Sequence, residues 1–103
     1  MLVVSRFRVG TTGRSETGFR EQLAAAIAAL AGQRGFRSAE SGRNVDDPDL
    51  WVLVTRWADV GSYRRALSSY DVRVTAVPLL SLALDEPSAY EPDEGELNRN
   101  VPR

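Results

Sequence analysis

Apolar and polar residues alternate along the start of the chain, from residue 2 to residue 9. A period of two is typical of a β-strand whose two faces meet different surroundings. Gly10 and Gly13 follow at once and predict that the strand ends in a turn. One face of this predicted strand would carry Val3, Ser5, Phe7 and Val9.

The period then changes to that of a helix over residues 15–31. Thr12 or Ser15 could cap its start, and Gly32 and Gly35 would end it. Large apolar residues recur three or four positions apart, which places them in one stripe on the helix: Phe19, Leu23, Ile27 and Leu30.

The segment from 35 to 57 predicts a hairpin. Residues 35–44 favour an exposed strand, 46–49 an acidic turn, and 50–57 the most apolar strand of the chain. The carboxylates of the turn, at positions 46, 47 and 49, lack the ligand spacing of a calcium loop. We therefore expect them to form the turn.

Asp59 is a good cap for a second helix, which would carry Tyr63, Leu67 and Tyr70 near one face. The pattern beyond it is ambiguous, because residues 72–84 fit either a helical stripe or an alternating strand. Pro78 excludes a central strand and is tolerated in the first turn of a helix. We expect a loop and a short helix over 76–84, then a last strand near 88–91.

This order predicts an α+β domain of the ferredoxin-like βαββαβ type over residues 1–91, followed by a polar tail over 92–103. Two helices would cover one face of a four-stranded antiparallel sheet. Val4, Val52 and Val54 would lie on the other face, which needs a cover in so small a protein. A second copy of the chain is the simplest cover and predicts a homodimer.

Composition narrows the chemistry, because the 103 residues include no cysteine and no histidine. Histidine-based catalytic triads, zinc sites of the Cys or His type, and haem held by His or Cys are therefore excluded. We expect no metal and no cofactor. Acid–base chemistry would fall to carboxylates, tyrosines, arginines, the substrate or water.

The net charge of −1 and the scattered arginines predict no surface for nucleic acid. No segment approaches the roughly 20 apolar residues of a membrane span, so no membrane partner is expected. The first residues are too few and too polar for a signal peptide, which favours a cytoplasmic location.

The order and spacing of several segments resemble the antibiotic biosynthesis monooxygenase superfamily, the dimeric α/β-barrel group. The resemblance covers residues 2–91. It rests on a strand ending in FRV, a glycine turn, an amphipathic helix, the pair Gly35-Phe36, a D-x-P turn and a strand closing in WAD. Trp57, which ends that strand, is its most specific feature.

The resemblance implies a dimer whose two sheets form a barrel, with a pocket in each subunit between sheet and helices. Members of this family oxygenate anthrones and quinols without metal or flavin, whereas relatives that degrade haem use a histidine that this chain lacks. Trp57 and Tyr63 match pocket residues of the oxygenases. Leu53 stands where those oxygenases typically carry an asparagine.

Trp57, Tyr63 and Arg73 are therefore the candidate catalytic residues. A fixed guanidinium such as that of Arg73 could stabilise a phenolate or enolate anion. The aromatic candidates have an alternative role in the core, since burying such a side chain contributes about 1.5–3 kcal/mol. Trp51 is expected mainly to serve packing. Candidate substrate contacts are Phe7, Leu53 and Tyr70.

The function predicted from these features is a cofactor-independent monooxygenase that acts on a small aromatic molecule such as an anthrone or quinol. The alternative is a non-catalytic dimeric module that binds a small molecule or another protein. The missing asparagine and histidine favour this alternative. A binding module would saturate with unchanged ligand, whereas an enzyme would consume it.

Overall fold

The computed structural model describes residues 1–93, so most of the predicted polar tail lies outside the described residues. Helices and strands follow one another in the order β1 (Leu2–Arg8), the 3₁₀ helix η1 (Val9–Thr11), α1 (Glu16–Ala31), β2 (Phe36–Arg43), β3 (Leu50–Trp57), α2 (Val60–Leu67), α3 (Tyr70–Thr75), α4 (Val77–Leu80) and β4 (Ala89–Tyr90).

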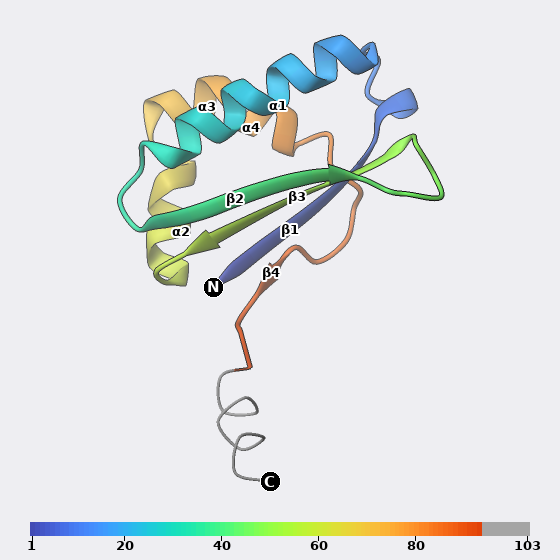
Figure 1. The fold of residues 1–103 in the computed structure, drawn as a ribbon. Coiled ribbons are helices and arrows are strands. Elements are labelled where there is room, and N and C mark those ends of the chain that lie inside the picture. Colours follow the sequence, from blue (N-terminus) through green and yellow to red (C-terminus); the bar gives the residue numbers. More distant parts are fainter. Residues whose placement is uncertain (94–103) are drawn as a thin grey trace, which may run out of the picture.

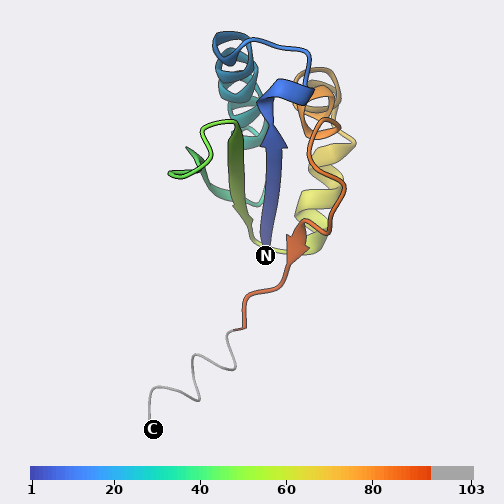
Figure 2. The ribbon, with the colours of Figure 1, turned by 90° about the vertical axis from the view of Figure 1, so that its right-hand side faces the viewer.

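The strands form one antiparallel sheet in the order β2-β3-β1-β4. The helices lie together on one side of it (Figure 1). In the view turned by 90°, the segment between α4 and β4 runs beside β1 (Figure 2). The predicted ferredoxin-like α+β fold, with its four-stranded sheet and helices on one face, is therefore confirmed.

The two faces of the sheet differ as the alternation predicts. Every second residue of β1 and β3 is buried under the helices, and the register places Ser5 opposite Leu53. On the other face Val4 lies opposite Val54, and both remain half-exposed, as does Val52. This second face has no cover within the described residues.

The first helix also follows its pattern. The Ser15 side chain, not that of Thr12, caps α1 by accepting a hydrogen bond from the Gly18 amide at 3.0 Å. The Thr12 hydroxyl instead donates to the Val9 carbonyl at 2.7 Å. Phe19, Leu23, Ala26 and Leu30 are buried on the sheet side of the helix.

The second helix is shorter than expected, and the chain after it is more helical. α2 ends at Leu67, because Ser69 caps a new helix by accepting a hydrogen bond from the Val72 amide. Tyr70, predicted to lie on the second helix, begins the separate helix α3 instead. The helix expected over 76–84 is limited to α4, with Pro78 in its first turn as predicted. The break turns Tyr70 outward, and it is 71% exposed.

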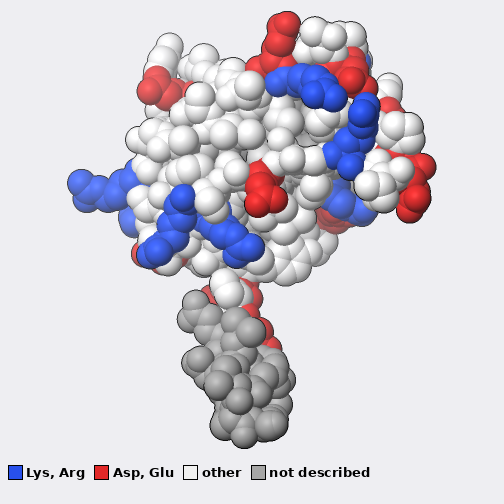
Figure 3. All heavy atoms as spheres, in the orientation of Figure 1, with Lys and Arg blue, Asp and Glu red and all other residues white. Residues whose placement is uncertain are grey.

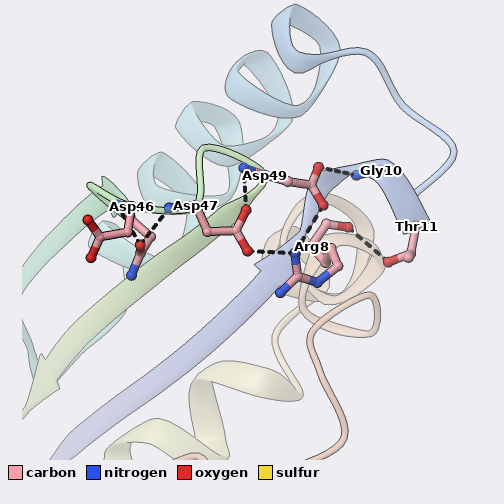
Figure 4. Close-up of polar contacts among 7 residues, drawn as sticks. Arg8, Gly10, Thr11, Asp46, Asp47 and Asp49 are labelled. Atoms are coloured by element: carbon pink, nitrogen blue, oxygen red, sulfur yellow. Dashed lines mark hydrogen bonds and ion pairs between the residues drawn. The ribbon is translucent and has the colours of Figure 1, made fainter.

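The acidic turn between β2 and β3 is held by the end of β1 (Figure 4). The Arg8 guanidinium donates to the carboxylates of Asp47 at 2.9 Å and Asp49 at 3.4 Å, and Asp49 also accepts from the Gly10 amide. The Asn44 side-chain oxygen accepts hydrogen bonds from the Asp46 and Asp47 amides. The carboxylates thus serve the turn.

Gly35 fixes the distance between the α1–β2 turn and α2. Its φ of 87° lies in the left-handed region, and a Cβ there would overlap the side chain of buried Ser62. The Gly35 carbonyl also accepts the Ala58 amide at 2.7 Å. Since Tyr63 follows Ser62 in α2, this close approach also positions Tyr63.

We expect Gly35→Ala to lower the free energy of unfolding by about 2–5 kcal/mol, the sum of about 1–2 for the positive φ and about 1–3 for the overlap with Ser62. Gly13→Ala is the matched control, because its φ of 76° is similar and no atom lies within 4 Å of the added Cβ. Urea unfolding of both variants measures the difference, and equal losses would contradict the close-contact role.

Candidate functional site

A narrow crevice lies between the inner face of the sheet and the helices. It is too narrow to admit a water molecule. Most of its walls are apolar, with three hydroxyl groups among them. The lining residues are Val3, Ser5, Leu30, Leu53, Thr55, Tyr63 and Leu80.

A larger cavity of about 360 Å³ adjoins this crevice at the edge of β1, and we call it the Tyr63 cavity. The crevice and the cavity share Ser5, Tyr63 and Leu80 in their linings. The remaining lining residues of the Tyr63 cavity are Val4, Ser81, Ala83, Leu84, Asp85, Glu86 and Ser88.

The cavity exists because the segment before β4 bulges away from β1 between two backbone hydrogen bonds. The Leu84 amide donates to the Arg6 carbonyl at 2.8 Å, and the Val4 amide donates to the Ser88 carbonyl at 2.7 Å. We call residues 84–88 the edge segment. Between these two hydrogen bonds the edge segment advances by four residues, whereas β1 advances by only two. The excess length bulges outward, as a bulge does in any antiparallel pair with unequal strands.

Tyr63 forms one wall of both spaces. Its helix begins at Asp59, whose carboxylate accepts the Ser62 amide at 2.7 Å. The Tyr63 hydroxyl makes no hydrogen bond within residues 1–93. Burial raises the pKa of this phenol above its ordinary value, so the group stays protonated and can donate at neutral pH.

Ser5 is a site residue that the sequence reasoning did not single out. It is only 7% exposed, lines both spaces, and its hydroxyl has no hydrogen-bond partner in the described part of the chain. A small polar residue on an otherwise apolar strand face was the available signal. Thr55 carried the same signal, but its hydroxyl accepts the indole N–H of Trp57 at 2.9 Å.

Trp57 lies behind Tyr63 and lines neither space. It is 1% exposed, with ring centroids 5.4 Å from Phe36 and 5.5 Å from Tyr63. Its indole N–H donates to the Thr55 hydroxyl, so that group is not free to bind a ligand. Any effect of Trp57 on the cavity therefore passes through the orientation of Tyr63.

The other predicted site residues differ in where the structure places them. Leu53 lines the crevice beside Tyr63, and its role as a substrate contact stays a prediction. Phe7 is fully buried and packs edge-on against Phe19, and it lines neither space. Tyr70 and Arg73 lie exposed on α3, so their roles stay predictions without a supporting contact.

Trp51 is held in the core at the other end of β3. It packs against Phe19 at 5.6 Å between ring centroids. The guanidinium groups of Arg20 and Arg43 lie 4.8 Å and 5.5 Å from the centre of its ring, and both pair with Glu16. These contacts agree with a packing role.

Residues 1–76 match the sequence profile of the family described as antibiotic biosynthesis monooxygenase. The chain belongs to this family. Comparison with curated proteins finds no relative.

Solved structures agree with the family assignment. The chain resembles SnoaB, a cofactor-independent oxygenase from Streptomyces nogalater, with 26% identity, a TM-score of 0.70, and 89% of this chain and 94% of that one covered. An asparagine-to-alanine mutant of SnoaB gives 28% identity and a TM-score of 0.69, with 81% and 82% covered. Rv0793 from Mycobacterium tuberculosis shares the fold at 20% identity and a TM-score of 0.66, with 88% and 92% covered.

Among residues 1–93, no helix has the length and apolar character needed to cross a bilayer.

The pKa of Tyr63 predicts how stability changes in alkali. Since burial raises this pKa above the ordinary 10.0, the unfolded chain ionises Tyr63 first, and stability falls as pH rises through that value. We expect Tyr63→Phe to lose less stability than the wild type between pH 9 and about 11. Tyr70→Phe removes an exposed tyrosine and is the control. Parallel losses for both variants in denaturant titrations would contradict the buried position of Tyr63.

Proposed function

We propose that this protein is a cofactor-independent monooxygenase that acts on a small, electron-rich aromatic molecule such as an anthrone or a quinol, as a cytoplasmic homodimer. The observation that carries the proposal is the Tyr63 cavity, where the unpaired hydroxyls of Ser5 and Tyr63 meet apolar walls. Its 360 Å³ falls within the range of about 300–1,000 Å³ that is usual for small-molecule sites.

The cavity offers an ionised ring oxygen two hydrogen-bond donors, Ser5 and Tyr63. Hydrogen-bond donors that face the anion lower the pKa of the bound phenol or enol. Val4, Leu80 and Ala83 line the cavity and supply apolar walls that displace water from the ring. An ionised, electron-rich ring is the form that can itself reduce oxygen.

The reaction balances without a further reductant. A ring CH₂ group of an anthrone becomes a carbonyl group and gives up four electrons. One atom of O₂ enters that carbonyl, and the other leaves as water with the two hydrogens of the CH₂. The protein's part is to bind the ring, to stabilise its anion and to exclude bulk water.

A binding module is the second candidate, and the position of Leu53 favours it. This residue places an apolar side chain where the resemblance to the oxygenases leads one to expect an amide. In the structure, the Leu53 side chain is part of the crevice lining. A module of this kind would hold the same aromatic ligand and release it unchanged.

Oxygen uptake separates the two candidates. In metal-free buffer with 1,8-dihydroxyanthrone, we expect uptake of one O₂ per anthraquinone formed, with one atom of ¹⁸O₂ in the product. Ser5→Ala and Tyr63→Phe should each lower kcat/KM about 10- to 100-fold, because a hydrogen bond to a charged group contributes about 1.5–3 kcal/mol. Val45→Ala, a change at an exposed residue of the hairpin turn, should keep the wild-type rate.

Rates equal to the protein-free blank across a panel of anthrones and quinols, with ligand bound and recovered unchanged, would reject the oxygenase and favour the binding module.

The homodimer rests on the uncovered sheet face, where Val4 and Val54 lie directly opposite each other. We expect the wild type to sediment as a dimer, and Val54→Asp to sediment as a folded monomer, because a charge buried between two sheets is costly. Val45→Asp is the control, since Val45 is 96% exposed in the hairpin turn. A wild-type monomer, or a dimer that tolerates Val54→Asp, would contradict this interface.

A further inference from the structure

The Tyr63 cavity has an unusual balance of charge in its lining. Within residues 1–93, Asp85 and Glu86 are the only charged residues in its lining, and both are acidic. Glu86 accepts two hydrogen bonds from Arg6, at 2.8 Å and 2.7 Å. Asp85 has no ion pair or hydrogen bond within residues 1–93.

We propose that Asp85 is a specificity-determining residue, which makes the cavity accept uncharged phenolic rings and reject aromatic ligands that carry a carboxylate. This inference rests on the proposed function, because it concerns the ligand of the same site. The inference separates anthrones and quinols without a carboxylate, which would bind, from those with one, which would not.

Neighbouring contacts hold Asp85 at the cavity. On one side the Leu84 amide donates to the Arg6 carbonyl, and on the other the Glu86 carboxylate is bound by the Arg6 guanidinium. Both neighbours of Asp85 are therefore attached to the same residue of β1. The short connection leaves the Asp85 backbone little freedom to move away from the cavity.

A ligand carboxylate that enters this cavity loses hydrating water and finds no cationic side chain to pair with. Losing hydration from a charged group is costly unless a partner replaces the water. Arg6 is the nearest arginine in sequence to the lining, but Glu86 occupies its Nε and one of its terminal nitrogens. Asp85 is exposed, and its carboxylate adds direct repulsion that water and salt screen in part.

The ring anion that forms in the reaction meets different conditions. Its charge is shared between the oxygen and the aromatic ring, and the Ser5 and Tyr63 hydroxyls can donate to it. A fixed carboxylate on the substrate would be a second negative charge without such donors. The same cavity can therefore stabilise one anion and reject the other.

The charge of the whole protein does not produce this selection. The net charge is −1, and the face drawn in Figure 3 carries both arginines and carboxylates. Selection by charge must come from groups in the cavity itself. Asp85 is the described residue that fits this role, because Glu86 is neutralised by Arg6.

A matched pair of ligands tests the proposal by calorimetry at neutral pH: 2-naphthol, which is uncharged, and 6-hydroxy-2-naphthoate, which adds one carboxylate. We expect the wild type to bind the naphthol more tightly. Asp85→Asn should narrow the ratio of the two affinities about three- to tenfold, the effect of one charge at several ångströms in a partly solvated site. The narrowing should shrink at high salt.

Asp46→Asn is the control, because it makes the same change of net charge in the exposed hairpin turn and should leave the ratio unchanged. The proposal is overturned by an unchanged ratio in Asp85→Asn, by equal affinities in the wild type, or by binding of neither ligand. Selective binding without oxygen uptake would support the proposal and reject the oxygenase. Oxygen uptake without selectivity would support the oxygenase and overturn the role of Asp85.

Discussion

The pairing of β1 with β3 determines which strand side chains reach the candidate site. Seven consecutive residue pairs, from Leu2–Arg56 to Arg8–Leu50, fix which side chains lie under the helices. A shift of β1 by one residue would turn Ser5 to the outer face and bring Val4 inward. The crevice and the cavity would then lose the Ser5 hydroxyl. The inward face of this one strand pair is thus both the core of the fold and the floor of the site.

The other walls of the site depend on two departures from regular structure. Gly35 adopts a positive φ and lets α2 approach, so Tyr63 reaches the sheet and packs on Trp57. The edge segment is longer than the part of β1 that it accompanies, so a cavity opens between them. The site therefore lies where the helical layer and the edge of the sheet meet, beside the best-packed aromatic residues of the chain.

The sequence predicted the parts of the structure that follow from local periodicity. The alternation in β1 and β3 and the stripe in α1 were sufficient for the fold, and the resemblance directed attention to Tyr63 and Leu53. The break at Ser69 was missed, because a serine cap competes with helix continuation by a margin that periodicity does not reveal. Ser5 and Asp85 were missed for another reason. Their importance comes from hydrogen bonds between residues about 80 positions apart, such as that of Glu86 with Arg6, and no local pattern records these.

The central claim is that the Tyr63 cavity is where an aromatic ligand binds and reacts. A crystal structure of the protein soaked with an anthraquinone product under metal-free conditions tests it most directly. The account predicts the ring beside Leu80 and Tyr63, with one quinone oxygen within hydrogen-bond distance of both the Ser5 and the Tyr63 hydroxyl. A ring bound on the outer face of the sheet, or on α3 beside Tyr70 and Arg73, would contradict it.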